Sequence, residues 1–311
     1  MNHMASATVL VTGATGFVGT ELVPLLLASG YRVVAAVRDG ATGVVAGVKT
    51  VRLPVHDEPD AAFETILDGV DHVVHLAAIA HTRLENGAEI YNAVNHVLPA
   101  RLAKAADKAI TGKFIFMSSI RAQCANIAQG VVLESDDPQP TDDYGRAKRH
   151  AEIDIAKFMP RRNYTILRPV LVYGAGVKGN LAALIKLAAL PIPLPFKSLA
   201  GKRSLVHRSS LCDAVIHCLN QPKTDGGTFI VADSSPVTVS QILVALRRGV
   251  KRNPSLFTCP VWIMDIAARI TGQRDRWATL NGDLVASSML LQSTGWKAVE
   301  NTEGEIEKLA G

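Results

Sequence analysis

Short apolar runs alternate with helical segments through the first half of the chain. Runs of about four to eight apolar residues that end at Gly, Pro or Asp are typical of strands buried on both faces of a parallel sheet. Strands are predicted at residues 8–11, 31–37, 48–54, 71–76 and 113–117. Helices are expected over residues 20–28, 61–67, 89–109 and 144–158. This alternation predicts an α/β fold built on a doubly wound parallel sheet.

The pattern changes after Tyr173, where a glycine-rich loop leads into a less regular second half. Helices are predicted there at residues 181–190, 210–220, 240–249 and 262–271, with a strand at 228–232 and an extended proline-rich stretch at 191–196. We therefore expect two units. The sheet domain takes residues 7–173, with about 204–232 returning to it, and a smaller mixed α/β lobe takes residues 174–203 and 233–311.

Three glycines, at positions 13, 16 and 19, lie between the first strand and the first helix. In a dinucleotide-binding turn, Gly13 would permit the tight turn, Gly16 would let the backbone approach a pyrophosphate, and Gly19 would let helix and strand pack closely. The helix N-terminus offers free N–H groups and a positive dipole end to the phosphates. The spacing is G-x-x-G-x-x-G, so an ordinary strand–helix turn stays the alternative.

The polar residues that follow the second strand bear on the choice between NAD and NADP. A carboxylate ending the second strand would bind the ribose hydroxyls of NAD, whereas an arginine suits the 2′-phosphate of NADP. Arg38 precedes Asp39, which favours NADP, with a surface role for Arg38 as the alternative. Asp57 either accepts a hydrogen bond from the adenine amino group or caps the following helix. Asn95, a polar residue within an apolar helical stretch, either ties neighbouring loops together or faces water.

Candidate acid/base residues follow the fifth strand. Ser118 and Ser119 end that strand, and ligands of such sheets bind beyond the carboxyl ends of the strands. Tyr144 and Lys148 open a helix, and their four-residue spacing puts them on one helical face. A phenol has a reference pKa of ~10, and a nearby ammonium favours the phenolate. Tyr144 is therefore a candidate proton donor and acceptor, with a strand-end serine hydrogen-bonded to the reacting oxygen.

With these features in place, the chain resembles the extended short-chain dehydrogenase/reductase family, the NAD-dependent sugar-nucleotide epimerases and dehydratases. The matching motifs are TGATGFVG at 12–19, HLAA at 75–78, FIFMSS at 114–119, YGRAK at 144–148 and RPVLVYG at 168–174. The resemblance implies a Rossmann-type sheet domain that binds NAD or NADP, followed by a substrate-binding lobe. It also implies a homodimer formed through the helix that carries Tyr144 and the helix before it.

The resemblance implies roles for single residues. Tyr144 would be the acid/base, Lys148 would hold the nicotinamide ribose and lower the tyrosine pKa, and Ser119 would bind the substrate oxygen. Further cofactor contacts would come from Gly13, Thr15, Gly16, Phe17, Val18, Gly19, Arg38, Asp57, Leu76, Ala77, Ala78, Asn95, Ser118 and Pro169.

Within the family, SSIRAQ, ESDDPQPTDDYGRAK and GKRSLVH are most similar to bacterial UDP-N-acetylhexosamine 4-epimerases and 4-ketoreductases of surface-polysaccharide synthesis. By that resemblance, Arg203 binds a diphosphate, Phe196 stacks on uracil and Asn180 lies near the sugar phosphate. Packing in the lobe core is the alternative for Phe196, and a structural role is the alternative for Arg203. Arg274 and Arg276 are candidates for further phosphate contact.

Two stretches depart from the family pattern. Residues 121–124 (RAQC) stand where the family often has a tyrosine–glycine pair, and Arg168 stands where UDP-galactose 4-epimerases usually have Asn before the proline. Both departures weaken the 4-epimerase assignment more than the family assignment.

Composition narrows the class of protein further. The 311 residues are 48% hydrophobic and 20% charged, as in soluble globular proteins. The net charge is +5, and the basic pairs 148–149, 161–162 and 247–248 are predicted to be solvated rather than to bind nucleic acid. Four cysteines without metal or disulfide spacing predict a reduced, cytoplasmic protein. We expect no metal site and no membrane insertion.

These features predict an NAD(P)-dependent enzyme that transfers a hydride at C4 of a UDP-hexose or UDP-N-acetylhexosamine. One alternative is an NAD(P)H-dependent 4-ketoreductase of a UDP-4-keto-6-deoxy-hexosamine. The other, from a different class, is a non-catalytic dinucleotide-sensing protein on the same fold.

Overall fold

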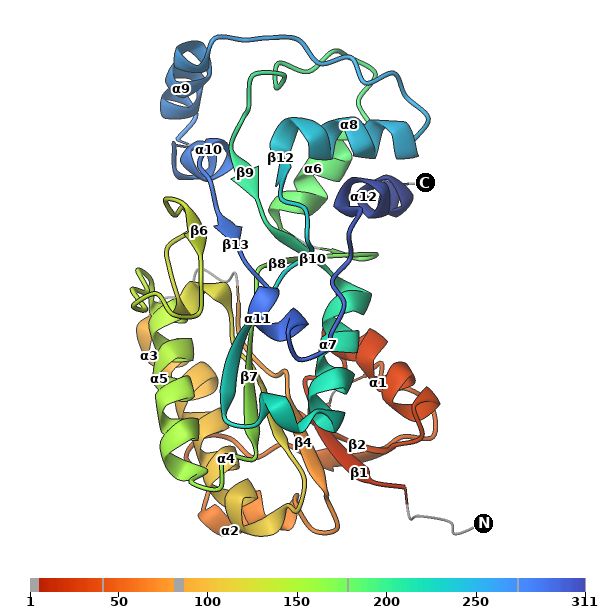
Figure 1. The fold of residues 1–311 in the computed structure, drawn as a ribbon, viewed down its shortest axis with the longest axis vertical. Helices are drawn as coiled ribbons and strands as arrows, with labels where there is room; N and C mark the ends of the chain where they lie inside the picture. Colours follow the sequence, from red (N-terminus) through yellow and green to blue (C-terminus); the bar gives the residue numbers. More distant parts are fainter. Residues whose placement is uncertain (1–5, 41, 81–86, 178, 273, 311) are drawn as a thin grey trace.

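The computed structural model describes residues 6–40, 42–80, 87–177, 179–272 and 274–310. A sheet of seven parallel strands lies at its centre, in the order β3-β2-β1-β4-β5-β7-β11 (Figure 1). Its strands are β1 (Thr8–Thr12), β2 (Arg32–Val37), β3 (Lys49–Arg52), β4 (His72–His75), β5 (Phe114–Met117), β7 (Tyr164–Pro169) and β11 (Gly227–Val231). The predicted doubly wound α/β fold is confirmed.

Helices cover both faces of this sheet. One layer contains α1 (Gly19–Ala28) and α7 (Arg208–Asn220), and the other contains α2 (Asp60–Thr65), α4 (Leu98–Ala109) and α5 (Asp143–Phe158) (Figure 1). Because successive side chains of a strand point to opposite faces, β1 contributes to both cores. Val9 and Val11 join the cluster with α1 and α7, and Leu10 joins the other cluster.

The predicted helix 89–109 consists of three consecutive helical pieces. They are α3 (Gly87–Tyr91), the π-helical segment η1 (Asn92–Val97) and α4. Asn95 lies in the π turn and is fully buried. Such widened turns interrupt α-helices mostly at functional sites. The apolar pattern indicated a helix here, but nothing in that pattern indicated the change of pitch.

The second half adds a lobe beyond the carboxyl ends of the strands (Figure 1). Its elements include α6 (Asn180–Ala188), β9 (Lys202–Arg203), β12 (Val237–Thr238), α8 (Val239–Gly249), α9 (Val261–Ile270), α10 (Arg274–Asn281) and α12 (Thr302–Ala310). The remaining short elements are η2 (Ile120–Ala122), β6 (Val131–Val132), β8 (Leu171–Tyr173), β10 (Leu205–His207), η3 (Pro222–Thr224), β13 (Val285–Ala286) and α11 (Met289–Gln292).

We propose that residues 174–203 and 233–311 act as a separate substrate lobe. The lobe has a hydrophobic cluster of its own, in which α8, α6 and α12 pack together around Leu243 and Leu246. The returning segment is part of the sheet domain, since β11 forms an edge of the sheet and α7 packs against α1.

In two of the three basic pairs, one residue is buried and not solvated as the sequence predicted. Lys148 and Arg247 are 1% and 2% exposed. The Arg247 guanidinium donates hydrogen bonds to the carbonyls of Leu190 (3.0 Å), Ile192 and Ser255 (3.1 Å), so backbone oxygens replace its water. All four cysteines have free thiols. Among the described residues, no helix is long and apolar enough to cross a membrane, and no group of His, Cys, Asp and Glu side chains could hold a metal ion.

Candidate active site

The glycine turn follows β1 at the point where the strand order reverses. Gly13 has φ +70°, and a Cβ there would lie 2.8 Å from the backbone N of Ala77, just beyond β4. A Cβ on Gly19 would lie 2.2 Å from the carbonyl oxygen of Gly13. The turn therefore lies in the crevice between β1 and β4, where open parallel sheets bind their ligands. Only residues without a side chain allow both approaches.

The start of α1 is open toward this crevice. No side chain caps the helix, whose N-cap residue is Val18. Gly16 is exposed, and its N–H donates to the carbonyl of Gly13 at 2.9 Å, which closes the turn. An uncapped helix N-terminus with exposed backbone fits a phosphate group, because free N–H groups and the dipole both favour an anion. The donor set thus fits the pyrophosphate of a dinucleotide.

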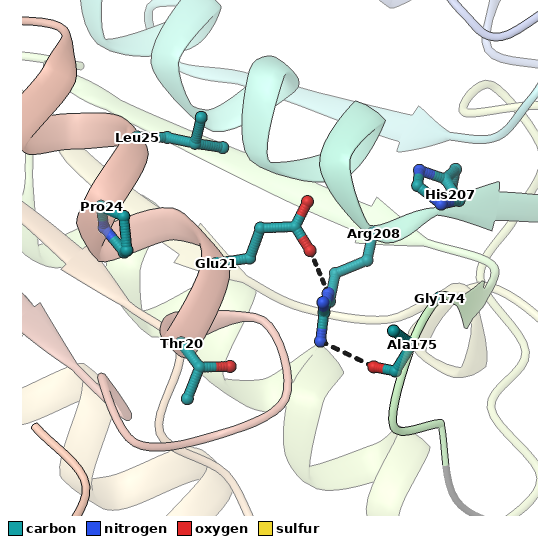
Figure 2. Close-up of a pocket in the computed structure, with 8 residues that line it drawn as sticks. All are labelled: Thr20, Glu21, Pro24, Leu25, Gly174, Ala175, His207 and Arg208. Carbon is teal, nitrogen blue, oxygen red and sulfur yellow. Dashed lines mark hydrogen bonds and ion pairs between the residues drawn. The ribbon is translucent and has the colours of Figure 1, made fainter. Parts of the chain in front are cut away.

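Arg208, the first residue of α7, braces the turn from the opposite side. Its guanidinium forms an ion pair with Glu21, donates to the carbonyls of Phe17 (3.3 Å) and Ala175 (2.9 Å), and stacks 4.8 Å from the Phe17 ring centroid. Figure 2 shows the contacts of Arg208 with Glu21 and Ala175. These residues line a pocket between α1, α7 and the loop after β8, with a volume of about 470 Å³. Sequence analysis missed Arg208, because its partners lie more than 30 residues away.

The residues expected to select the cofactor lie at the edge of the sheet. Arg38 and Asp39 are exposed just after β2. Asp57 is exposed in the turn after β3 and does not cap α2, whose N-cap is Pro59 without a side-chain hydrogen bond. The capping alternative for Asp57 is therefore wrong. The helix begins at Asp60, two residues later than a cap at position 57 would require.

The loop after β4 is held by two polar side chains. Thr12 accepts a hydrogen bond from the backbone N of Ala77 at 3.1 Å. Asn95 binds both backbone groups of Ile79, accepting from its N–H at 2.9 Å and donating to its carbonyl at 2.8 Å. Asn95 thus ties loops together and does not face water. Through these bonds the loop of Leu76, Ala77 and Ala78 lies beside the glycine turn.

Ser119 and Tyr144 lie together at the carboxyl end of β5. Ser119 is the N-cap of η2, where its hydroxyl accepts from the N–H of Arg121 at 3.2 Å, and it lies beside Tyr144. The Tyr91 ring meets the Tyr144 ring edge-on, with centroids 5.9 Å apart. Burial raises the pKa of Tyr144 to about 12, and the neighbouring Ser119 side chain opposes this shift.

Lys148 is buried one helical turn after Tyr144. Its ammonium donates to the carbonyl of Met117 at 2.8 Å and lies 4.7 Å from the Phe116 ring centroid. Burial lowers the pKa of Lys148 to about 7, against the opposing charge of Glu152. The ammonium is thus turned toward Met117. That Lys148 lowers the Tyr144 pKa stays a prediction.

Ser118 belongs to a buried network that the sequence analysis missed. Its hydroxyl donates to Glu152 at 2.5 Å, and Arg168 forms an ion pair with the same carboxylate and a hydrogen bond with Gln123. Glu152 and Arg168 are each 2% exposed. Glu152 follows Lys148 by four residues, so helical spacing was a signal that could have indicated it. Arg168, which stands where UDP-galactose 4-epimerases usually have Asn, thus links β7 to α5 through Glu152.

The candidate substrate residues lie in the lobe and near its base. Arg203 donates to the carbonyls of Asn126 (2.8 Å) and Thr279, so its guanidinium bridges the loop after η2 and α10. Phe196 is half-buried and packs against the lobe cluster, as its alternative interpretation required. Asn180 is exposed as the first residue of α6. The side chains of Arg274 and Arg276 lie outside the described residues.

Comparison with known proteins agrees with this geometry. The model of the NAD dependent epimerase/dehydratase family matches residues 9–232. A UDP-glucose 4-epimerase from Vibrio cholerae is 33% identical over 97% of this chain and 94% of its own length. The chain belongs to the NAD dependent epimerase/dehydratase family. The predicted membership of an NAD-dependent family of enzymes is confirmed.

Other relatives widen the range of activities within the epimerase/dehydratase family. The UDP-glucose 4-epimerase of Thermotoga maritima, solved with UDP-glucose, superposes with a TM-score of 0.77 over 97% of both chains at 20% identity. This likeness extends the shared fold to the lobe. A dTDP-4-dehydro-6-deoxy-D-allose reductase from Streptomyces bikiniensis is 32% identical over 56% of this chain and 59% of its own length.

Proposed function

We propose that this chain is a sugar-nucleotide 4-epimerase that acts on a UDP-hexose or UDP-N-acetylhexosamine. The observation that carries the proposal is the proximity of Ser119 to Tyr144, with Lys148 one turn farther along α5, beside a crevice suited to a dinucleotide. The relative from Vibrio cholerae, similar over nearly the whole chain, supports the 4-epimerase assignment.

In this proposal, Ser119 holds the oxygen of the reacting sugar carbon and Tyr144 carries its proton. A bound nicotinamide would supply the group that accepts a hydride from that carbon and donates it again. Tyr144 takes the hydroxyl proton as the carbon is oxidised and gives it back on reduction. A folded-state pKa near 12 keeps the phenol protonated, so the positive charge of a bound pyridinium is needed to favour the phenolate. Lys148 would bind the nicotinamide ribose.

The remaining site assignments are part of the same proposal. The cofactor contacts are Gly13, Thr15, Gly16, Phe17, Val18, Gly19, Arg38, Asp57, Leu76, Ala77, Ala78, Asn95, Ser118 and Pro169. Ser118 and Asn95 act indirectly in this proposal, because their side chains are bound to Glu152 and to the backbone of Ile79. Asn180, Phe196 and Arg203 are the substrate contacts of the lobe.

A 4-ketoreductase acting on a UDP-4-keto-6-deoxy-hexosamine is the second candidate. It is favoured by the reductase relative from Streptomyces and by Arg168 in place of the Asn that is usual in UDP-galactose 4-epimerases. One assay separates the two. An epimerase interconverts the 4-epimers of a UDP-hexosamine without added cofactor, provided that the dinucleotide stays bound. A ketoreductase turns over only when the 4-keto sugar nucleotide and NAD(P)H are supplied.

Tyr144→Phe tests the catalytic proposal itself. The variant keeps the ring and its contact with Tyr91 but loses the proton, so we expect turnover to fall by about 10²–10⁴-fold with the dinucleotide affinity almost unchanged. Turnover is measured by coupled or chromatographic assay and affinity by calorimetry. Unchanged turnover would contradict the assignment. Dinucleotide binding without turnover in the wild type, on all these sugars, would instead favour the non-catalytic sensor.

We also propose a cytoplasmic homodimer formed through α4 and α5. Ile153 is 49% exposed on α5, and the His96 and His150 rings meet 5.4 Å apart between η1 and α5 on the same side of the molecule. A bundle formed with the same helices of a second copy would cover Ile153. Sedimentation of the wild type and of Ile153→Lys tests this assembly, and a monomeric wild type would contradict it.

A further inference from the structure

The outer end of the lobe carries an apolar surface that the proposed chemistry does not use. In α9, Trp262 is 65% exposed and Ile270 81% exposed, with Ile263 and Ile266 exposed between them. At about 100° per residue these four side chains lie within an arc of roughly 100°. Met264 and Ala268 lie on the opposite side of the helix and pack against the lobe cluster. The helix is thus apolar on both its inner and its outer side.

Two other segments of the lobe also expose apolar side chains. Ile192 (55% exposed) and Phe257 (48% exposed) lie in two strands of chain that run side by side, since Leu194 and Phe257 bond through their backbones at 3.0 Å. Buried Arg247 fixes both segments by binding carbonyl oxygens of each. Figure 1 shows α9 and the loop before it at the end of the molecule farthest from α2. Arg247 therefore holds the segments that carry Ile192 and Phe257 in fixed positions.

Positive charge gathers at the same end. Residues 180–200 and 247–272 contain seven Lys and Arg and one acidic residue, Asp265, whereas the whole chain has a net charge of +5. The rest of the chain is therefore close to neutral. One of the seven, Arg247, is buried, and α12, which packs against α8, carries Glu303, Glu305 and Glu307. Asp265 is neutralised by an ion pair with Arg269 at 2.8 Å. Lys251 and Arg252 are exposed in the loop that leads to α9.

We infer that this end of the lobe docks on the surface of a bilayer that contains anionic lipid. An exposed apolar arc that contains Trp, at an end of the molecule with net positive charge, fits the interface of an anionic bilayer, where Trp is favoured. Ten residues are too few to span a bilayer, so α9 lies along the surface. Like charge opposes self-association through this end, which makes a second copy a poorer fit. The inference does not depend on the reaction catalysed.

Vesicle co-sedimentation tests the inference on the full chain. The probes are phosphatidylcholine vesicles with and without ~30% phosphatidylglycerol. We expect binding to the anionic vesicles, weakened by added salt. Trp262→Ser/Ile266→Ser/Ile270→Ser should reduce the partition coefficient at least tenfold. Lys251→Asn/Arg252→Gln should reduce it several-fold, and Asn suits the positive φ of 55° at position 251.

Two controls keep the test specific. Met289→Ser/Leu290→Ser removes equally exposed apolar side chains from α11, away from α9, and should leave vesicle binding unchanged. Fluorescence gives an independent readout, because Trp277 and Trp296 are buried, so that an emission shift on vesicle addition reports on Trp262. Circular dichroism and dinucleotide affinity check that each variant is folded.

Three outcomes would overturn the inference. They are no binding to anionic vesicles, equal binding to neutral vesicles, and equal loss of binding in the α11 control. A concentration-dependent oligomer that the α9 variant abolishes, without vesicle binding, would show that a second copy covers this surface instead.

Discussion

At the scale of single residues, burial shifts the pKa values of the candidate site more than neighbouring charges do. Tyr144 and Lys148 have their pKa values moved in opposite directions, to about 12 and about 7, and desolvation of the charged form is the main cause for both. In the protein alone, therefore, the phenol is protonated and the amine is partly neutral near pH 7. Binding of a charged cofactor would shift the pKa values of both groups.

Lys148 should leave a signature in the pH dependence of stability. Its folded-state pKa of about 7 lies below the reference value of 10.5, so between these values the unfolded chain holds a proton that the folded chain has released. Stability then rises with pH across this window. We expect the free energy of unfolding of the wild type to rise relative to that of Lys148→Met between pH 7 and about 9. Urea unfolding at a series of pH values measures this difference, and a pH-independent difference would contradict the prediction.

The Glu152–Arg168 pair should behave as a buried ion pair. Arg168→Met leaves a buried carboxylate with Ser118 and Arg149 as partners, so we expect a loss of about 3–5 kcal/mol in the free energy of unfolding. Glu152→Gln/Arg168→Met should cost less than Arg168→Met alone, because no unpaired charge stays buried. Chemical denaturation gives both values. Lys308→Met, which breaks an exposed pair with Glu305, serves as the control and should change stability by less than about 1 kcal/mol.

At the scale of elements, α5 organises the site. Tyr144, Lys148 and Glu152 follow one another at four-residue intervals, so one helical face presents the acid/base candidate, the amine and its carboxylate. Asp142 caps the helix by accepting from the N–H of Gly145 at 2.7 Å, and it also pairs with Arg121. The cap therefore ties the start of α5 to η2, where Ser119 lies.

Gly145 allows this close approach of two elements. A Cβ at position 145 would lie 2.3 Å from the carbonyl oxygen of Arg121. Gly145→Ala should push η2 away from α5 and separate Ser119 from Tyr144, which lowers kcat by about tenfold or more. Stability should fall by about 1–3 kcal/mol, as in other overpacked sites.

The same experiment distinguishes positioning from general destabilisation. Gly249→Ala creates a comparable clash in the lobe, 2.2 Å from the carbonyl of Glu307, and serves as the matched control. It should reduce stability with much less effect on kcat. Equal kcat losses in both variants, measured well below their unfolding temperatures, would contradict the positioning role of Gly145.

For the whole molecule, Arg208 connects the glycine turn to the lobe. It binds Phe17 and Glu21 in the sheet domain and Ala175 at the start of the lobe. We expect Arg208→Ala to lower the free energy of unfolding by about 1.5–3 kcal/mol, since hydrogen bonds to a charged group are lost. The affinity for the dinucleotide should fall too, because the glycine turn loses the contacts with Arg208 that hold it in place. Arg269→Ala, which removes a more exposed pair with Asp265 in α9, is the control for both measurements.

Much of the sheet domain could be predicted because its signals are local. Strands buried on both faces require continuous apolar runs such as 113–117, and the turn between β1 and α1 requires glycine at positions 13 and 19. The spacing of Tyr144 and Lys148 follows from helical geometry alone. The lobe offered weaker signals. Strands of two residues, such as β9 and β12, are too short to show any periodicity, and they are defined by pairing between segments about 35 residues apart.

The amino-acid order therefore specified the sheet, the glycine turn and the spacing of the candidate catalytic side chains, since each depends on residues close together in the chain. The tertiary structure alone decided which charges are buried. Lys148 and Arg247 look like surface residues in the sequence, yet backbone carbonyls from distant segments enclose them. Desolvation depends on what packs around a group, and that information exists only once the chain is folded.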